Sequence, residues 1–133
     1  MVLSEAEGLL KIATADLETA EASSDPAVFR EGAWGFWLQQ AVEKALKAWL
    51  LHLDVDAPLT HDLRRLLLLL LAAAGESTAD LEPLAQLTVY AVQFRYDADP
   101  TPLGLDRAHD NRQVKALLAR VNALILPGSD SDP

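Results

Sequence analysis

Apolar residues recur at a spacing of three to four along most of the chain, which is the period of an α-helix. They divide the sequence into five predicted helices, which span about residues 4–23, 28–53, 61–74, 80–96 and 110–126. No stretch has the strict alternation of apolar and polar residues that is typical of a half-buried strand. The pattern predicts an all-α, up-and-down bundle of about five helices with a four-helix core.

Local signals mark the ends of two of these helices. Ser4 and Glu7 have the spacing of a capping box at the start of the first helix. Thr60 is the predicted N-cap of the third helix, which places His61 in its opening turn. Gly75 follows the last apolar residue of that helix and is its predicted stop.

The starts of the other helices are set by glycine and proline. Gly32 and Gly35 weaken the first turns of the second helix, so we expect it to begin nearer Trp34. Pro83 is tolerated in the first turn of the fourth helix. The loop DADPTPLGLD then holds two prolines and a glycine, and the fifth helix is predicted to begin at about Asp110.

The third helix is apolar nearly all round, in the sequence LRRLLLLLLAAA. Such a helix is buried on most faces, either in the centre of a bundle or in a subunit interface. Together with Trp34, Trp37 and Trp49, it forms more apolar surface than we expect a five-helix monomer to bury. The sequence therefore predicts a two-fold homodimer.

Length and composition indicate one soluble domain. The 133 residues fit a single core, which we assign to residues 1–126, followed by a disordered acidic tail at residues 127–133. The absence of cysteine excludes disulfides, zinc–thiolate sites and thiol nucleophiles. The longest apolar run, residues 66–74, is shorter than the roughly 20 residues that span a bilayer. With no signal peptide at the N-terminus, we expect a cytoplasmic protein that does not contact a membrane.

Charge and motifs narrow the chemistry further. The net charge of −9, from 20 acidic and 11 basic residues, disfavours broad nucleic-acid binding. His52, His61 and His109 are too scattered to form a metal site by local spacing, and no Gly-rich phosphate loop, HExxH or GxSxG motif is present. We therefore expect no metal and no cofactor.

Residues 36–65, FWLQQAVEKALKAWLLHLDVDAPLTHDLRR, begin as a helix whose charged and amide groups lie among aromatics and alanines. Gln40 and Lys44, and likewise Glu43 and Lys47, are i,i+4 neighbours, which places their side chains in one polar stripe. The stripe adjoins a ridge of alanines, so it is expected near a helix–helix contact. Two interpretations remain open at this point: ion pairs that stabilise the bundle, or a surface for a ligand or partner.

This stretch resembles the HEPN domain, the small helical domain named from higher eukaryotes and prokaryotes. The resemblance covers roughly residues 4–126, and a second matching feature is the aromatic–Arg–Tyr end of the fourth helix at residues 94–96. The matching residues of the quoted stretch are Phe36, Gln39, Gln40, Ala41, Glu43, Lys44, Ala45, Lys47, Ala48, Thr60, His61, Asp62 and Leu63.

Many HEPN proteins are metal-independent ribonucleases, whose motif is an arginine followed after four to six residues by a histidine. In such a pair, imidazole moves the 2′-hydroxyl proton while arginine stabilises the phosphate charge. None of the seven arginines here has a histidine at that distance; Arg107 and His109 are too close. Lys47 and His52 have the spacing, but lysine lacks the planar fork of arginine. Catalysis is therefore not expected.

The resemblance implies a non-catalytic role instead. Short HEPN proteins are often homodimeric binding subunits, or toxins, paired with a minimal nucleotidyltransferase, and nucleotide binding by the polar stripe has been proposed for the family. The ligand or partner surface expected on this basis comprises Gln40, Lys44, Lys47, His61, Asp62, Arg65, Arg95 and Tyr96.

Two alternatives remain. One is a divergent ribonuclease, the toxin of a toxin–antitoxin pair, that acts on RNA through His61 and Arg65 or through Lys47 and His52. The other is a purely structural dimer.

Overall fold

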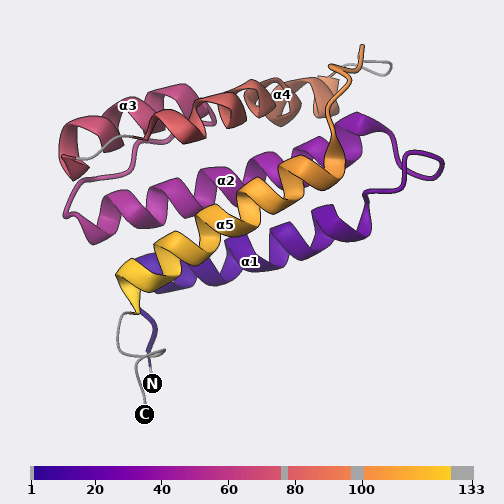
Figure 1. Cartoon of the computed structure of the whole chain (residues 1–133). Helices are drawn as coiled ribbons and strands as arrows, with labels where there is room; N and C mark the ends of the chain where they lie inside the picture. Colours follow the sequence, from indigo (N-terminus) through magenta and orange to yellow (C-terminus); the bar gives the residue numbers. More distant parts are fainter. Residues whose placement is uncertain (1, 76–77, 97–100, 127–133) are drawn as a thin grey trace.

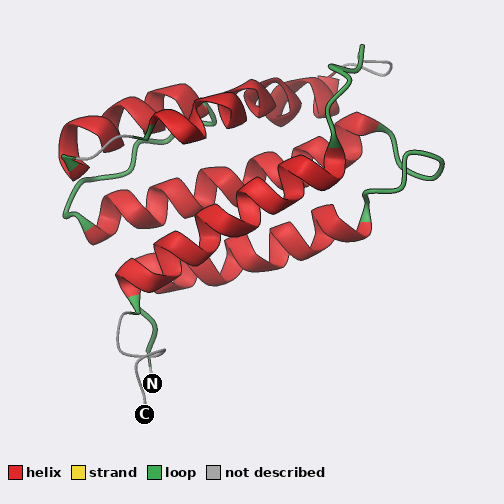
Figure 2. Ribbon diagram, in the orientation of Figure 1, coloured by secondary structure: helices red, strands yellow, loops and turns green. Residues whose placement is uncertain are grey.

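The computed structural model describes residues 2–75, 78–96 and 101–126. Helices account for all the regular structure in these ranges, and no strand occurs among them (Figure 2). This confirms the all-α prediction. The elements are α1 (Glu5–Ala22), α2 (Glu31–His52), α3 (Leu63–Ala74), the 3₁₀-helix η1 (Ala79–Thr88), α4 (Val89–Tyr96) and α5 (Arg107–Ile125).

Helix α2 lies at the centre of the molecule and contacts every other helix (Figure 1). The four long segments α1, α2, η1–α4 and α5 alternate in direction and form the predicted four-helix core. The loop that follows α2 runs back along it, so α3 begins beside the middle of α2 and runs in the same direction. This return of the chain brings residues near position 61 against the centre of α2.

Buried alanines and buried tryptophans have different roles in the packing of α2. Ala41, Ala45 and Ala48 are fully buried and allow neighbouring helices to approach closely, while Trp34 and Trp49 fill the space on either side. The expectation that the tryptophans exceed what one chain can bury is therefore wrong for these two. Their burial follows from the central position of α2, which is covered from several sides.

Two glycines lie inside α2, which begins at Glu31 rather than near Trp34 as predicted. A Cβ atom at Gly35 would overlap the ring of the buried Tyr90 on α4. The close approach of α4 thus requires glycine here, and its packing offsets a helix-propensity cost of about 1 kcal/mol. The predicted start was wrong because propensity was overridden by this contact.

The start of α3 also differs from the prediction. Asp62, not Thr60, is the N-cap, because the Asp62 carboxylate accepts a hydrogen bond from the N–H of Arg64 at 3.1 Å. The hydroxyl of Thr60 instead accepts from the N–H of Asp62. His61 therefore lies in the loop before α3, outside its opening turn. Gly75 ends the helix with a φ of +69°, which confirms the predicted stop.

Only one side of α3 is covered within the chain. Its buried residues are Leu63, Leu66, Leu67 and Leu70. Leu68 and Leu71 remain 62% and 52% exposed. A central position for α3 in the bundle is therefore excluded, and its outer face presents leucine to the surroundings.

The helices between residues 79 and 125 also differ from the prediction, in type or in their first residue. The segment with Pro83 winds as a 3₁₀-helix up to Thr88, because proline has no N–H and lies beyond the first turn. Asp106 caps α5 by accepting from the N–H of His109 at 3.0 Å, so α5 starts at Arg107 instead of Asp110.

In the described ranges, no helix combines the length and apolarity needed to cross a membrane.

Candidate functional site

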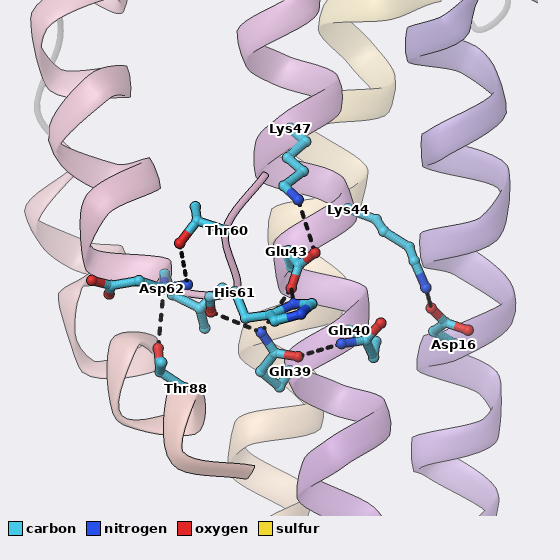
Figure 3. Close-up of polar contacts among 11 residues, drawn as sticks. Asp16, Gln39, Gln40, Glu43, Lys44, Lys47, Thr60, His61, Asp62 and Thr88 are labelled. Atoms are coloured by element: carbon cyan, nitrogen blue, oxygen red, sulfur yellow. Dashed lines mark hydrogen bonds and ion pairs between the residues drawn. The ribbon is translucent and has the colours of Figure 1, made fainter. Parts of the chain in front are cut away.

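The polar stripe predicted on α2 is organised around one buried carboxylate. Glu43 accepts at Oε1 from Nδ1 of His61 at 2.8 Å and from Nε2 of Gln39 at 3.1 Å (Figure 3). Its Oε2 accepts from Nζ of Lys47 at 3.0 Å, which confirms the i,i+4 neighbours predicted at these positions. We call Gln39, Gln40, Glu43, Lys47 and His61 the Glu43 network.

Gln39 extends this network in two directions. Its fully buried side chain donates from Nε2 to the backbone carbonyl of His61 at 3.1 Å. Its Oε1 accepts from Nε2 of Gln40 at 2.6 Å. Both the backbone and the ring of His61 are thus attached to α2, and the end of the α2–α3 loop is fixed in place (Figure 3).

The environment of Glu43 determines its ionisation. Burial by itself would raise the pKa of this carboxyl, because it disfavours the charged form. Hydrogen bonds from His61, Gln39 and Lys47 outweigh burial and lower the pKa below its ordinary value of 4.5. Glu43 is therefore a carboxylate at neutral pH, held among its donors.

Lys44 does not join this network. Its Nζ forms an ion pair with the carboxylate of Asp16 on α1, at 2.5 Å (Figure 3). Sequence reasoning missed Asp16, which lies among Ala13, Leu17 and Ala20 on the buried side of α1. An acidic residue on an apolar helix face is the signal that indicates a partner on the facing helix.

The remaining predicted residues lie beyond the network. Asp62 caps α3. Arg65 is exposed, and among the residues that the structure describes its guanidinium has no hydrogen-bond or ion-pair partner. Arg95 and Tyr96 are the last two residues of α4, and their side chains lie outside the described part of the structure.

The buried polar atoms of the described part of the site all have hydrogen-bond partners. In the described ranges, no buried side-chain nitrogen or oxygen lacks a hydrogen-bond partner. Nor does any group of three His, Asp or Glu side chains there have an arrangement that could hold a metal ion. What the network exposes is the ring of His61, whose side chain is 56% exposed. The site therefore combines a closed interior with a polar edge.

A second polar cluster, which sequence reasoning missed, lies at the start of α2. Glu31 accepts from the hydroxyl of Tyr90 and from the N–H groups of Leu103 and Leu105. Burial acts to raise the pKa of Glu31, but these hydrogen bonds lower it overall. Burial and the bond to Glu31 raise the pKa of Tyr90 to about 12. The partners are 59 to 74 residues away in the sequence, so no local spacing could indicate them.

Comparison with known proteins identifies one family. The family model of the HEPN domain matches residues 6–127. The matched range runs from α1 to α5 and includes both polar clusters. No curated protein and no solved structure matches the chain.

Proposed function

Because the chain belongs to the HEPN domain family, we propose that it is a non-catalytic, homodimeric binding subunit, or toxin-like partner, of a minimal nucleotidyltransferase. The observation that carries this proposal is that the Glu43 network holds an exposed His61 against α2, just before the α3 turn that carries the exposed Arg65. Polar groups that are already held in place lose little entropy on binding. We assign the partner or nucleotide surface to this edge of α2 and α3.

The charge and the sequence motifs favour binding over catalysis. The arginine-to-histidine spacing of the family's ribonucleases is absent from the chain. The ring of His61 is paired with a carboxylate, not with an arginine that could stabilise a phosphate in a transition state. A net charge of −9 would also repel an RNA substrate.

The outer face of α3 supports the homodimeric part of the proposal. Leu68 and Leu71 are exposed beside a groove of about 270 Å³ between α3 and η1. At its rim, Arg64 and Glu82 form an exposed ion pair. Apolar side chains next to an apolar groove, with both charge signs at the rim, suit a two-fold contact in which each copy inserts leucine into the other.

Titration calorimetry tests the binding surface, with the minimal nucleotidyltransferase encoded by the neighbouring reading frame as the partner. Arg65→Ala should weaken binding at least about tenfold, since it removes a charged hydrogen-bond donor, and should leave the melting temperature unchanged. Lys44→Ala should lower the melting temperature, because it leaves Asp16 without its partner. Arg112→Ala, an exposed arginine on α5, is the matched control. Equal affinities of the Arg65→Ala and Arg112→Ala proteins would contradict the assignment.

One observation favours the ribonuclease alternative. Glu43 binds Nδ1 of His61, the arrangement by which a carboxylate orients an imidazole for proton transfer. Our proposal predicts that the purified protein leaves single-stranded RNA and tRNA intact over hours, with or without divalent metal. Cleavage that disappears in His61→Ala would establish the alternative, and loss only in His52→Ala would instead indicate the pair Lys47 and His52.

A further inference from the structure

Residues at the starts of α2 and α5 line a cavity of about 320 Å³, which adjoins the second polar cluster around Glu31. The two helices begin at the same end of the molecule (Figure 1). This volume lies within the range of small-molecule sites, which starts at about 300 Å³. Position 31 is twelve residues from Glu43 along α2, or about 18 Å at the rise of an α-helix. The cavity is thus separate from the Glu43 network. Its lining includes Pro26, Arg30, Glu31, Tyr90, Pro102 and Arg107.

Arg107 is held in this cavity by neutral groups. Its NH1 donates to the backbone carbonyls of Phe29 at 2.8 Å and Ser23 at 3.3 Å. Its guanidinium carbon lies 5.6 Å from the centre of the Trp34 ring. Among the residues that the structure describes, no carboxylate forms an ion pair with Arg107. Within the described ranges, the guanidinium is therefore positioned by neutral acceptors, and it has N–H donors beyond those that bind Phe29 and Ser23.

Glu31 is the one carboxylate among the described residues of the lining, and it is directed toward the protein. Both oxygens of Glu31 already accept hydrogen bonds, Oε1 from Leu103 N–H and the Tyr90 hydroxyl, and Oε2 from Leu105 N–H. Its charge is thereby stabilised from within the chain. Among the described lining residues, the guanidinium of Arg107 thus has donors left for a ligand, and Arg30 adds a second positive charge, on a chain whose net charge is −9.

We propose that this cavity binds a small organic phosphate, with Arg107 as the principal anion ligand and Arg30 as the second cation. The planar fork of arginine matches phosphate oxygens. A phosphate monoester carries nearly two negative charges at neutral pH. It therefore matches two guanidinium groups better than a ligand with one carboxylate would. Pro26, Pro102 and the Tyr90 ring provide apolar surface for the organic part of the ligand. The proposal does not depend on the function proposed for the α2–α3 edge.

Nuclear magnetic resonance of ¹⁵N-tryptophan-labelled protein tests the proposal, because Trp34 lies under Arg107. The probes are inorganic phosphate, adenosine 5′-monophosphate, adenosine and acetate, at constant ionic strength. We expect phosphate and the monophosphate to shift the indole signal of Trp34 in a saturable way, while adenosine and acetate leave it in place. The signals of Trp37 and Trp49 serve as internal references.

Matched arginine variants locate the site. Arg107→Gln should weaken monophosphate binding at least about tenfold, since it removes charged hydrogen bonds, whereas Arg112→Gln on the exposed side of α5 should bind normally. The exposed Arg30→Gln should weaken binding by a smaller factor, and it tests the site independently if Arg107→Gln fails to fold.

Three results would overturn the proposal. They are no saturable Trp34 shift at millimolar phosphate, equal shifts with acetate, or full binding by the folded Arg107→Gln or Arg30→Gln protein. Loss of binding in Arg65→Gln alone would move the phosphate site to the α2–α3 edge.

Discussion

At the scale of single residues, the polar stripe proves to have two parts. Glu43 and Gln39 are buried and bonded to one another, so their first role is to attach the α2–α3 loop to α2. His61 and Arg65 lie at the exposed edge. Of the two interpretations that the sequence left open, stabilisation of the bundle thus describes Glu43 and Gln39, and the binding surface that we propose is limited to the exposed edge.

Replacement of Glu43 should change both stability and its pH dependence. Since the folded state lowers the pKa of Glu43, its stabilising contribution is present above pH 4.5 and is lost as the pH falls through the folded value. We expect Glu43→Gln to reduce the free energy of unfolding at pH 7 by about 3 kcal/mol, because it breaks a buried charged network. The difference from the wild type should shrink at pH 4. Urea unfolding at both values measures it.

Glu21→Gln is the control for this experiment, since Glu21 is exposed on α1. It should follow the wild type at both pH values. A Glu43→Gln protein that lost the same stability at pH 4 as at pH 7 would show that the carboxylate charge contributes nothing, and that the network acts through packing alone.

Local spacing explains which contacts the sequence could predict. Glu43 and Lys47 are one helical turn apart, so their pairing follows from the helix itself. Asp16 and Lys44 are 28 residues apart, and Glu31 and Leu105 are 74 apart. Pairs of this kind depend on how the helices pack, which the period of apolar residues does not specify.

At the scale of elements, the first residue of α3 depends on which of two side chains accepts the hydrogen bond of the N-cap. Thr60 and Asp62 both suit an N-cap, and the structure uses the aspartate for the helix and the threonine for the preceding turn. Along α3, a run of consecutive leucines carries no period that could indicate which side is buried. The sequence therefore located this helix well but could not orient it.

The exposed side of α3 leads to a prediction about assembly. Leu68→Glu combined with Leu71→Glu should convert a dimer into a monomer of 14.5 kDa, because the charges would have to be buried in the two-fold contact. Both positions are more than half exposed within one chain, so the change should leave the fold of each subunit intact. Light scattering coupled to gel filtration gives the mass.

Ile12→Glu provides the control, because Ile12 is 48% exposed on α1, away from α3. That protein should remain dimeric. A wild-type monomer at micromolar concentration would refute the homodimer, and a double variant that still had twice the monomer mass would place the contact elsewhere.

At the scale of the whole molecule, the bundle could be predicted and the cavity could not. The helical period gave the number of long segments, and the resemblance of residues 36–65 indicated the family that the family model then matched. The cavity requires Pro26, Tyr90 and Arg107 to meet around the start of α2. Pro26 lies in the α1–α2 connection, Tyr90 near the start of α4 and Arg107 at the first position of α5. The period of apolar residues does not indicate that these three positions meet.

The contact between Gly35 and Tyr90 has a consequence for the divergence of this protein. The ring occupies the space that any side chain at position 35 would need, and the hydroxyl of the same ring binds Glu31 one turn earlier on α2. A larger residue at position 35 can be accommodated only if position 90 becomes smaller, and that change removes a donor from Glu31. Positions 31, 35 and 90 should therefore be replaced together during evolution, as one coupled unit of sequence change.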